Sequence, residues 1–112
     1  MALPLSKDDI SPDITPGELA QRLRVGKAPR MIDVREPHEF ASGRIPGAES
    51  MPLSRFTMQF RSLPQQEELV LVCRSGSRSG LAQEFLQSQG YTKTRNLIDG
   101  MLGWNGPVTS GR

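Results

Sequence analysis

An unbroken apolar run at residues Leu69–Val72 constrains the fold of this chain more than any other part of its sequence. The run has no polar alternation, which is typical of a strand buried on both faces of a parallel sheet. A polar segment, residues 74–79, follows the run, and apolar residues at helical spacing come next. Because a parallel sheet needs helices to bury both of its faces, the run favours an α/β fold with a mostly parallel sheet.

Turn and cap signals divide the rest of the chain into alternating strands and helices. Thr15 is expected to cap a helix that starts at Pro16, and Glu18 is expected to complete a capping box. The other predicted strands are residues 31–34, 48–51 and 94–97. The other predicted helices are residues 37–42, closed by Gly43, residues 54–61, with Phe56 and Phe60 on one side, residues 79–89, ended by Gly90, and residues 100–104. The expected core-facing residues of the first helix and of helix 79–89 are Leu19, Leu23, Leu81, Ala82, Phe85 and Leu86.

Length and charge place the chain among small proteins with one domain. Its 112 residues suit a single core, which we expect at about residues 14–105 between short flexible tails. The net charge of +2 is far from that of a nucleic-acid-binding tail, so nucleic acid is not an expected partner. The longest apolar run, residues 69–73, is too short to span a membrane, and the charged residues 7–9 come too early for a signal peptide. We therefore expect a cytoplasmic protein without a membrane partner.

Cys73 is the single cysteine of the chain, which excludes an internal disulfide, a structural zinc cluster and a dithiol redox pair. It stands at the carboxyl end of the most buried predicted strand, where parallel sheets bind ligands. The loop of small residues that follows can turn backbone N–H groups inward, and the next helix N-terminus adds positive potential. Such surroundings lower a cysteine pKa from about 8.5 to roughly 3.5–7.5. Arg74 and Arg78 would add charge for a dianionic ligand, so we interpret Cys73 as a reactive thiolate rather than a structural core residue.

Three blocks of the sequence resemble the single-domain rhodanese, or thiosulfate sulfurtransferase, family. They are residues 32–40 with 43–48, residues 71–79 around Cys73, and residues 98–100 with Trp104. The resemblance implies a three-layer α/β/α sandwich whose five parallel strands follow the order 3-2-4-5-1. That order reverses between strands 31–34 and 69–72, so residues 33–36 would border the cysteine loop.

The resemblance also implies a reaction. Members of the family take the outer sulfur of thiosulfate onto the cysteine, release sulfite, and pass the sulfur to cyanide or a thiol. Here Cys73 would attack and would carry the sulfur as a persulfide. No cofactor is implied, and the expected partners are a small anionic donor such as thiosulfate and a thiol or protein acceptor. The loop that would hold the anionic sulfur through its N–H groups consists of Arg74, Ser75, Gly76, Ser77, Arg78 and Ser79.

Several residues outside this loop are expected to support the site. Asp33 and Arg35 are interpreted as an ion pair that ties adjacent loops together. Arg44 either lines the substrate entrance or is a solvated surface residue. Because the loop itself would keep the thiolate formed, no general base is needed, and the single histidine, His38, is placed on a short surface helix. Asp99 is expected to cap the last helix.

Two classes of function are alternatives to an enzyme that transfers sulfur: a cysteine-dependent phosphatase or arsenate reductase, and a persulfide carrier. Cysteine-dependent phosphatases and arsenate reductases use a similar loop, but such phosphatases usually have one residue more than the four between Cys73 and Arg78. Arsenate reductases commonly need resolving thiols, which this chain lacks. The stronger alternative is a persulfide carrier in a sulfur relay, loaded by a cysteine desulfurase. Turnover of thiosulfate and cyanide, compared with transfer from a desulfurase, would separate the enzyme from the carrier.

Overall fold

β4 (Leu69–Val72) lies at the centre of a five-stranded sheet in a computed structural model of the chain, which describes residues 11–111. The strand order is β1-β5-β4-β2-β3, and every neighbouring pair is parallel. Read from the other edge, this is the order 3-2-4-5-1, so the prediction of an α/β fold with that sheet is confirmed. The other strands are β1 (Asp13–Ile14), β2 (Arg30–Asp33), β3 (Glu49–Ser50) and β5 (Thr94–Leu97).

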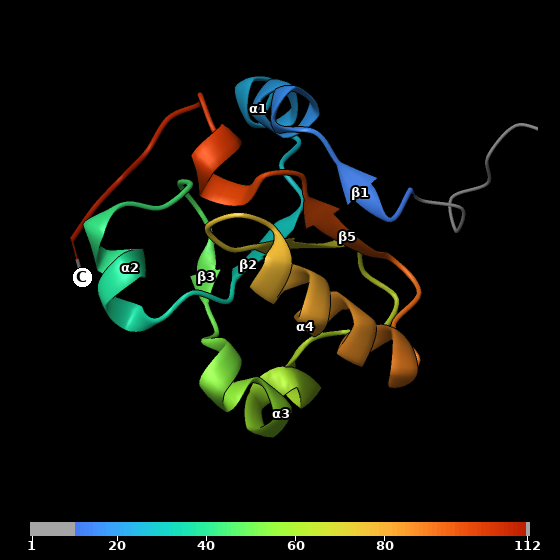
Figure 1. Ribbon diagram of the computed structural model, residues 1–112. Coiled ribbons are helices and arrows are strands. Elements are labelled where there is room, and N and C mark those ends of the chain that lie inside the picture. Colours follow the sequence, from blue (N-terminus) through green and yellow to red (C-terminus); the bar gives the residue numbers. More distant parts are fainter. Residues whose placement is uncertain (1–10, 112) are drawn as a thin grey trace, which may run out of the picture.

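Helices cover both faces of the sheet (Figure 1). On one face lie α1 (Pro16–Arg24) and the 3-10 helix η3 (Gly100–Gly103). The opposite face carries α4 (Ser77–Ser88) and a short helical segment, with α2 (Pro37–Ser42) beyond the end of β2. That segment runs without a break through η1 (Leu53–Arg55), α3 (Phe56–Gln59) and η2 (Phe60–Ser62).

Both faces of the central strand β4 are buried, which accounts for its unbroken apolar sequence. Its side chains alternate between two hydrophobic cores, one on each face of the sheet. Val70 and Val72 pack with the residues of α1 and η3, whereas Leu69 and Leu71 pack with those of α3 and α4. All four side chains are 0% exposed. Burial of each such side chain stabilises the fold by about 1.5–3 kcal/mol. Cys73 continues the second set and belongs to the α4 core.

The expected core stripe of α4 is partly wrong. Leu81 is 58% exposed, whereas Ala82 and Leu86 are fully buried as expected. The sheet-facing side of the helix also includes polar side chains, Ser79 and Gln83. The Gln83 amide donates to the backbone carbonyls of residues 12 and 94, and these bonds compensate its burial.

Two local predictions need smaller corrections. Thr15 does cap α1, since its hydroxyl accepts a hydrogen bond from the Glu18 amide over 3.1 Å. The Glu18 carboxylate, however, accepts from Arg95 of β5 instead of closing a capping box. Asp99 precedes η3 with φ 62°, but its side chain makes no cap hydrogen bond.

The N-terminal tail before residue 11 lies outside the described residues. Between residues 11 and 111, no helix has the length and apolar character needed to cross a bilayer.

Candidate active site

The site is built around a tight turn between β4 and α4. Cys73 follows the last residue of β4, and α4 begins only four residues later, at Ser77. Gly76 stands between them with φ 102°, a backbone conformation that residues with a side chain rarely adopt. The turn therefore depends on a glycine at this position, and it brings the N-terminus of α4 back over the cysteine.

Hydrogen-bond donors surround the sulfur of Cys73. The backbone N–H of Gly76 donates to Sγ over 3.0 Å, and the Ser79 hydroxyl lies 3.2 Å from Sγ. The side chain is 1% exposed and shares its cluster with apolar neighbours such as Leu71 and Ala82. The sulfur thus has an apolar side toward the core and a polar side toward the loop.

The donors decide the ionisation of the sulfur. Burial by itself raises the pKa of the Cys73 thiol. The Ser79 hydroxyl and the backbone N–H groups of Ser79, Gly76 and Ser75 outweigh that effect, so the pKa lies below its ordinary value. A thiolate is the nucleophilic form of cysteine, so the loop favours the reactive form.

The rear of the loop is held by η3. The carbonyl of Cys73 accepts a hydrogen bond from the Met101 amide over 2.9 Å, and the carbonyl of Arg74 accepts from the Leu102 amide over 3.0 Å. In a trans peptide the C=O and the following N–H point in opposite directions. Because the Arg74 carbonyl is fixed on η3, the amide that follows it, that of Ser75, points away from η3 and toward the sulfur. Gly100 makes the close approach possible, because a Cβ there would lie 2.7 Å from the Arg74 carbonyl.

The sequence does not predict this contact. Residues 98–100 form one of the three blocks that resemble the family, and Asp99 and Gly100 predict only a turn before the last helix. The signal that pointed to it was the glycine at position 100, which suits a close backbone contact. Nothing in the local sequence says that the contact is with the cysteine loop.

Arg78 is engaged by an acidic partner. Its guanidinium forms two hydrogen bonds to the Glu39 carboxylate of α2, over 2.7 and 2.9 Å. The side-chain hydrogen bond from Arg78 holds the pKa of Glu39 at about 2, well below its usual range. The Glu39 carboxylate also accepts from the Glu36 amide over 3.1 Å. Arg78 therefore joins α4 to α2, while Arg74 in the same loop is exposed.

Asp33 and Arg35 form a buried ion pair. The guanidinium of Arg35 donates to both oxygens of Asp33, the shortest bond being 2.7 Å, and also to the Gly43 carbonyl over 2.7 Å. Ile32 and Val34 belong to the core that contains Cys73, so the Asp33 side chain points to the opposite face of the sheet. The pair lies beside the cysteine strand, but it supports the segment after α2.

Arg44 makes its contacts away from the loop. Its guanidinium carbon lies 4.5 Å from the centroid of the Phe40 ring, and it donates to the carbonyls of Phe40 and Gly111. Its backbone pairs with Thr109 in an antiparallel bridge. The structure therefore uses Arg44 to join α2 to the C-terminal segment. His38, by contrast, is exposed on α2, as expected.

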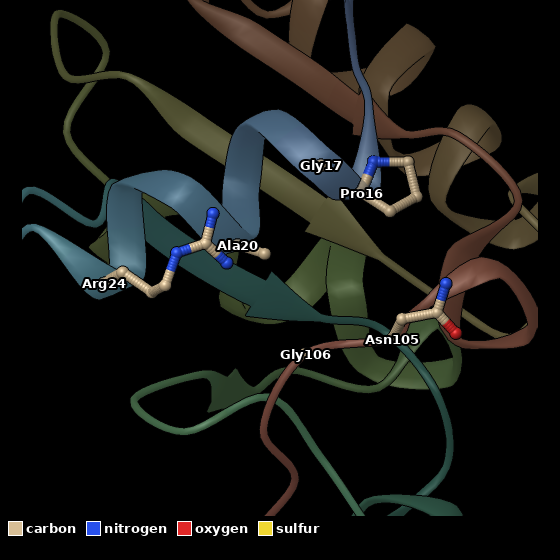
Figure 2. A pocket seen from close by; sticks show the side chains of 6 residues that line it. All are labelled: Pro16, Gly17, Ala20, Arg24, Asn105 and Gly106. Atoms are coloured by element: carbon tan, nitrogen blue, oxygen red, sulfur yellow. The ribbon is translucent and has the colours of Figure 1, made fainter.

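Among the residues that the structure describes, hollows lie beside the cysteine loop and along α1. One has a volume of about 220 Å³ and adjoins the cysteine loop; its lining residues are Ser75, Asp99, Leu102 and Gly103. The other, of about 230 Å³, runs along α1 on the face opposite to α4. Figure 2 shows Pro16, Gly17, Ala20 and Arg24 along α1, facing Asn105 and Gly106. The first hollow lies where η3 meets the loop, and Ser75 is the loop residue that lines it. The described residues contain no group of three or more side chains suited to a metal ion.

A cysteine that follows a central parallel strand, beside the point where the strand order reverses, and precedes a tight turn into a helix places the chain among α/β proteins with a thiol at the switch point of the sheet. Within that class, the model of the rhodanese-like domain family matches residues 15–107. The chain belongs to this family.

Known proteins agree with that assignment. The chain is 35% identical over 92 residues to a sulfurtransferase of Allochromatium vinosum, covering 82% of this chain and 86% of that protein. It is 30% identical over 95 residues to the putative sulfur carrier protein YrkF of Bacillus subtilis, covering 85% of this chain but only 51% of that protein. A solved rhodanese-like domain protein from Staphylococcus aureus aligns with a TM-score of 0.82 at 29% identity, covering 91% of this chain and 100% of that one. These relatives thus include a sulfurtransferase and a putative sulfur carrier protein.

Proposed function

We propose that this chain transfers sulfane sulfur from thiosulfate to a thiol or cyanide through a persulfide on Cys73. In the first step, the Cys73 thiolate attacks the outer sulfur of thiosulfate, and sulfite leaves with the electron pair of the broken S–S bond. In the second step, the acceptor attacks the outer sulfur of the persulfide, and the Cys73 thiolate leaves. Each step breaks one S–S bond and forms one new bond to the transferred sulfur, which is S–S with a thiol acceptor and C–S with cyanide, so no external oxidant or reductant is needed.

The observation that carries this proposal is the 3.0 Å hydrogen bond from the Gly76 amide to the Cys73 sulfur. A donor aimed at the sulfur stabilises the thiolate that attacks in the first step and leaves in the second. The neighbouring amides would hold the negative outer sulfur between the two steps. One arrangement of backbone donors thereby supports both half-reactions without a general base.

Thiosulfate would be held with little help from Arg78, because the Glu39 carboxylate already occupies its guanidinium. The exposed Arg74 and the loop amides are the positive groups left to meet the dianion. Ser75 stands where the two-domain members of the family can carry a lysine. We therefore propose that this chain binds thiosulfate weakly, with the amides as its main donors.

The persulfide carrier is the second candidate, and the similarity to a putative sulfur carrier protein favours it. The chain holds one cysteine, so a loaded sulfur cannot be lost to another thiol of the same chain, which suits a carrier and a free enzyme equally. A carrier would take its sulfur from a protein persulfide and would turn over thiosulfate poorly.

Intact-mass measurement after brief treatment with thiosulfate tests the proposal. We expect the wild type to gain one sulfur atom, Cys73→Ser to gain none, and Ser88→Ala, changed at the far end of α4, to behave as the wild type. Added cyanide should then remove the sulfur and release thiocyanate. A wild type that loads only from a cysteine desulfurase would establish the carrier instead, and one that loads from neither donor would overturn both.

A further inference from the structure

Asn96 of β5 links the cysteine loop to the N-terminal turn of α4, and the proposed function gives it no role. Its side-chain amide donates to the Gly76 carbonyl over 3.0 Å. Its oxygen accepts from the Ser79 hydroxyl over 2.6 Å. The same hydroxyl lies 3.2 Å from the Cys73 sulfur. Asn96, Ser79 and Cys73 therefore form a continuous chain of polar contacts under the loop.

The chain of contacts contains a competition for one proton. A serine hydroxyl has a single O–H donor, so Ser79 can donate to Asn96 or to Cys73 but not to both. The Asn96 amide cannot turn around to relieve this, because only its NH₂ group can donate to the Gly76 carbonyl. Its oxygen must then face Ser79. Hence the sulfur gains the Ser79 donor only when Asn96 loses it.

We propose that the Ser79 hydroxyl is a two-position switch, donating to Cys73 while the sulfur is a thiolate and to Asn96 while the sulfur is a thiol or an internal persulfide sulfur. In the thiol state, the S–H group would donate to the Ser79 oxygen. In the persulfide, the negative charge lies on the outer sulfur, so the inner sulfur no longer competes for the hydroxyl. The Ser79 proton never leaves its oxygen; only the direction of the O–H bond changes.

The switch rests on the proposed function and assigns Asn96 as a positioning residue. As a competing acceptor, Asn96 disfavours the free thiolate relative to both the thiol and the loaded persulfide. Asn96 would thereby raise the pKa of Cys73 above the value that the loop alone would set, and it would favour retention of the sulfur. If Asn96 only held the loop in place, its removal would disorder the donors and raise the pKa of Cys73. If Asn96 competes for the Ser79 hydroxyl, its removal lowers that pKa.

Charged groups around the sulfur are common to all variants of the test. Arg78 of α4 interacts electrostatically with Cys73 and is itself paired with Glu39 of α2. Arg74 belongs to the loop, and Asp99 follows β5. The Asp33 carboxylate of β2 points to the opposite face of the sheet. None of these groups is altered by substitutions at positions 79 and 96, so differences between variants report on the switch.

The pH dependence of Cys73 alkylation by iodoacetamide tests the switch with the full chain. We compare the wild type with Ser79→Ala, Asn96→Ala and the double variant, and we use Asn96→Leu as a second variant that keeps the branched shape of the side chain without its polar atoms. We expect the midpoint to move down by about half a unit to one unit in Asn96→Ala and Asn96→Leu, which corresponds to the net effect of one hydrogen bond. Ser79→Ala should move it up, and the double variant should match Ser79→Ala.

Two results would overturn the switch. One is an upward shift in both Asn96 variants, which is the effect of a loop that has lost its support. The other is an Asn96→Ala shift of the same size with and without Ser79. Because alkylation needs no sulfur donor, this test stays valid if thiosulfate fails to load Cys73. Its outcome is therefore separate from that of the proposed function.

Discussion

Gly100 packs directly against the peptide bond that follows Cys73. A Cβ atom on Gly100 would overlap the Cys73 carbonyl oxygen and would lie 2.7 Å from the carbonyl carbon and oxygen of Arg74. The glycine also adopts φ 53°, in the left-handed region. Two independent constraints, backbone conformation and space, therefore exclude a side chain at the point where η3 meets the cysteine loop.

Gly100→Ala is expected to damage both stability and sulfur transfer. Overpacking of a close contact costs about 1–3 kcal/mol, and displacement of the loop amides by about 1 Å lowers transfer on the order of 100-fold. Thermal unfolding and the rate of sulfur loading on Cys73 measure the two effects. Gly17→Ala, at a position with no atom within 4 Å of the new Cβ, is the matched control. Equal loading rates in the two variants would contradict the role given to the contact.

The ion pair between Glu39 and Arg78 makes stability depend on pH in the acid range. The folded-state pKa of Glu39 is about 2, against an ordinary value of 4.5. The pair therefore stabilises the fold fully above pH 4.5, and its contribution is lost as the pH falls through the folded-state value. Because both side chains are partly exposed, we expect Glu39→Gln to cost only about 0.5–1 kcal/mol at neutral pH.

Urea unfolding of the wild type and Glu39→Gln between pH 5 and pH 2, a range set about the two pKa values, measures this dependence. The two midpoints should converge as the pH falls. Glu84→Gln, on the exposed side of α4, is the control and should leave the profile unchanged. A constant difference between wild type and Glu39→Gln across the range would show that the carboxylate is not held ionised by Arg78.

The buried pair of Asp33 and Arg35 should matter for stability more than for sulfur transfer. Asp33→Asn leaves the Arg35 charge buried without its partner, which costs about 3–5 kcal/mol. Because the Asp33 side chain faces away from Cys73, the loading rate per folded molecule should stay near that of the wild type. Urea unfolding and loading measured at low temperature check the two statements. The double variant Asp33→Leu with Arg35→Leu, which removes both charges, should be less destabilised than Asp33→Asn.

The Cys73 thiol should ionise at lower pH in the folded chain than in the unfolded chain. Burial opposes ionisation, but the Ser79 hydroxyl and the loop amides outweigh it. We expect the midpoint of alkylation in the native protein to lie below about 8.5, the ordinary value for cysteine. The same chain in concentrated urea is the control and should show the ordinary value. A native midpoint at or above the unfolded one would mean that burial dominates.

Local patterns predicted much of the fold. The apolar run at Leu69–Val72 predicts the central strand, which the structure has at the same residues. The spacing of Phe56 and Phe60 predicts that they share one side of a helix, and both rings are buried. β1 was not located, because two residues carry no readable periodicity. Leu81 was assigned to the core because α4 offers two apolar pairs at the same spacing. Ala82 and Leu86 are the pair that is buried, against residues of β4 and α3 that lie outside α4 in the sequence.

The candidate site was likewise predictable only where its residues are neighbours in the sequence. The cysteine, its loop and the following helix N-terminus are neighbours in the chain, so the sequence could indicate an anion-binding turn. The carboxylate that occupies Arg78 comes from Glu39, 39 positions earlier, and Asn96 approaches Ser79 from another strand. Such partners depend on how the sheet and helices assemble. No pattern within a short window of sequence carries that information.

Hydrogen bonds from η3 and from Asn96 of β5 fix the backbone of the cysteine turn, so the donors around the sulfur are in place before any reactant binds. A loop arranged in advance needs little reorganisation during a reaction. Under the proposed function, donor and acceptor would meet the same preformed loop in turn, and the two half-reactions would differ in the reacting molecule rather than in the conformation of the loop. Differences in turnover among donors and acceptors would accordingly arise from their rates of association and dissociation.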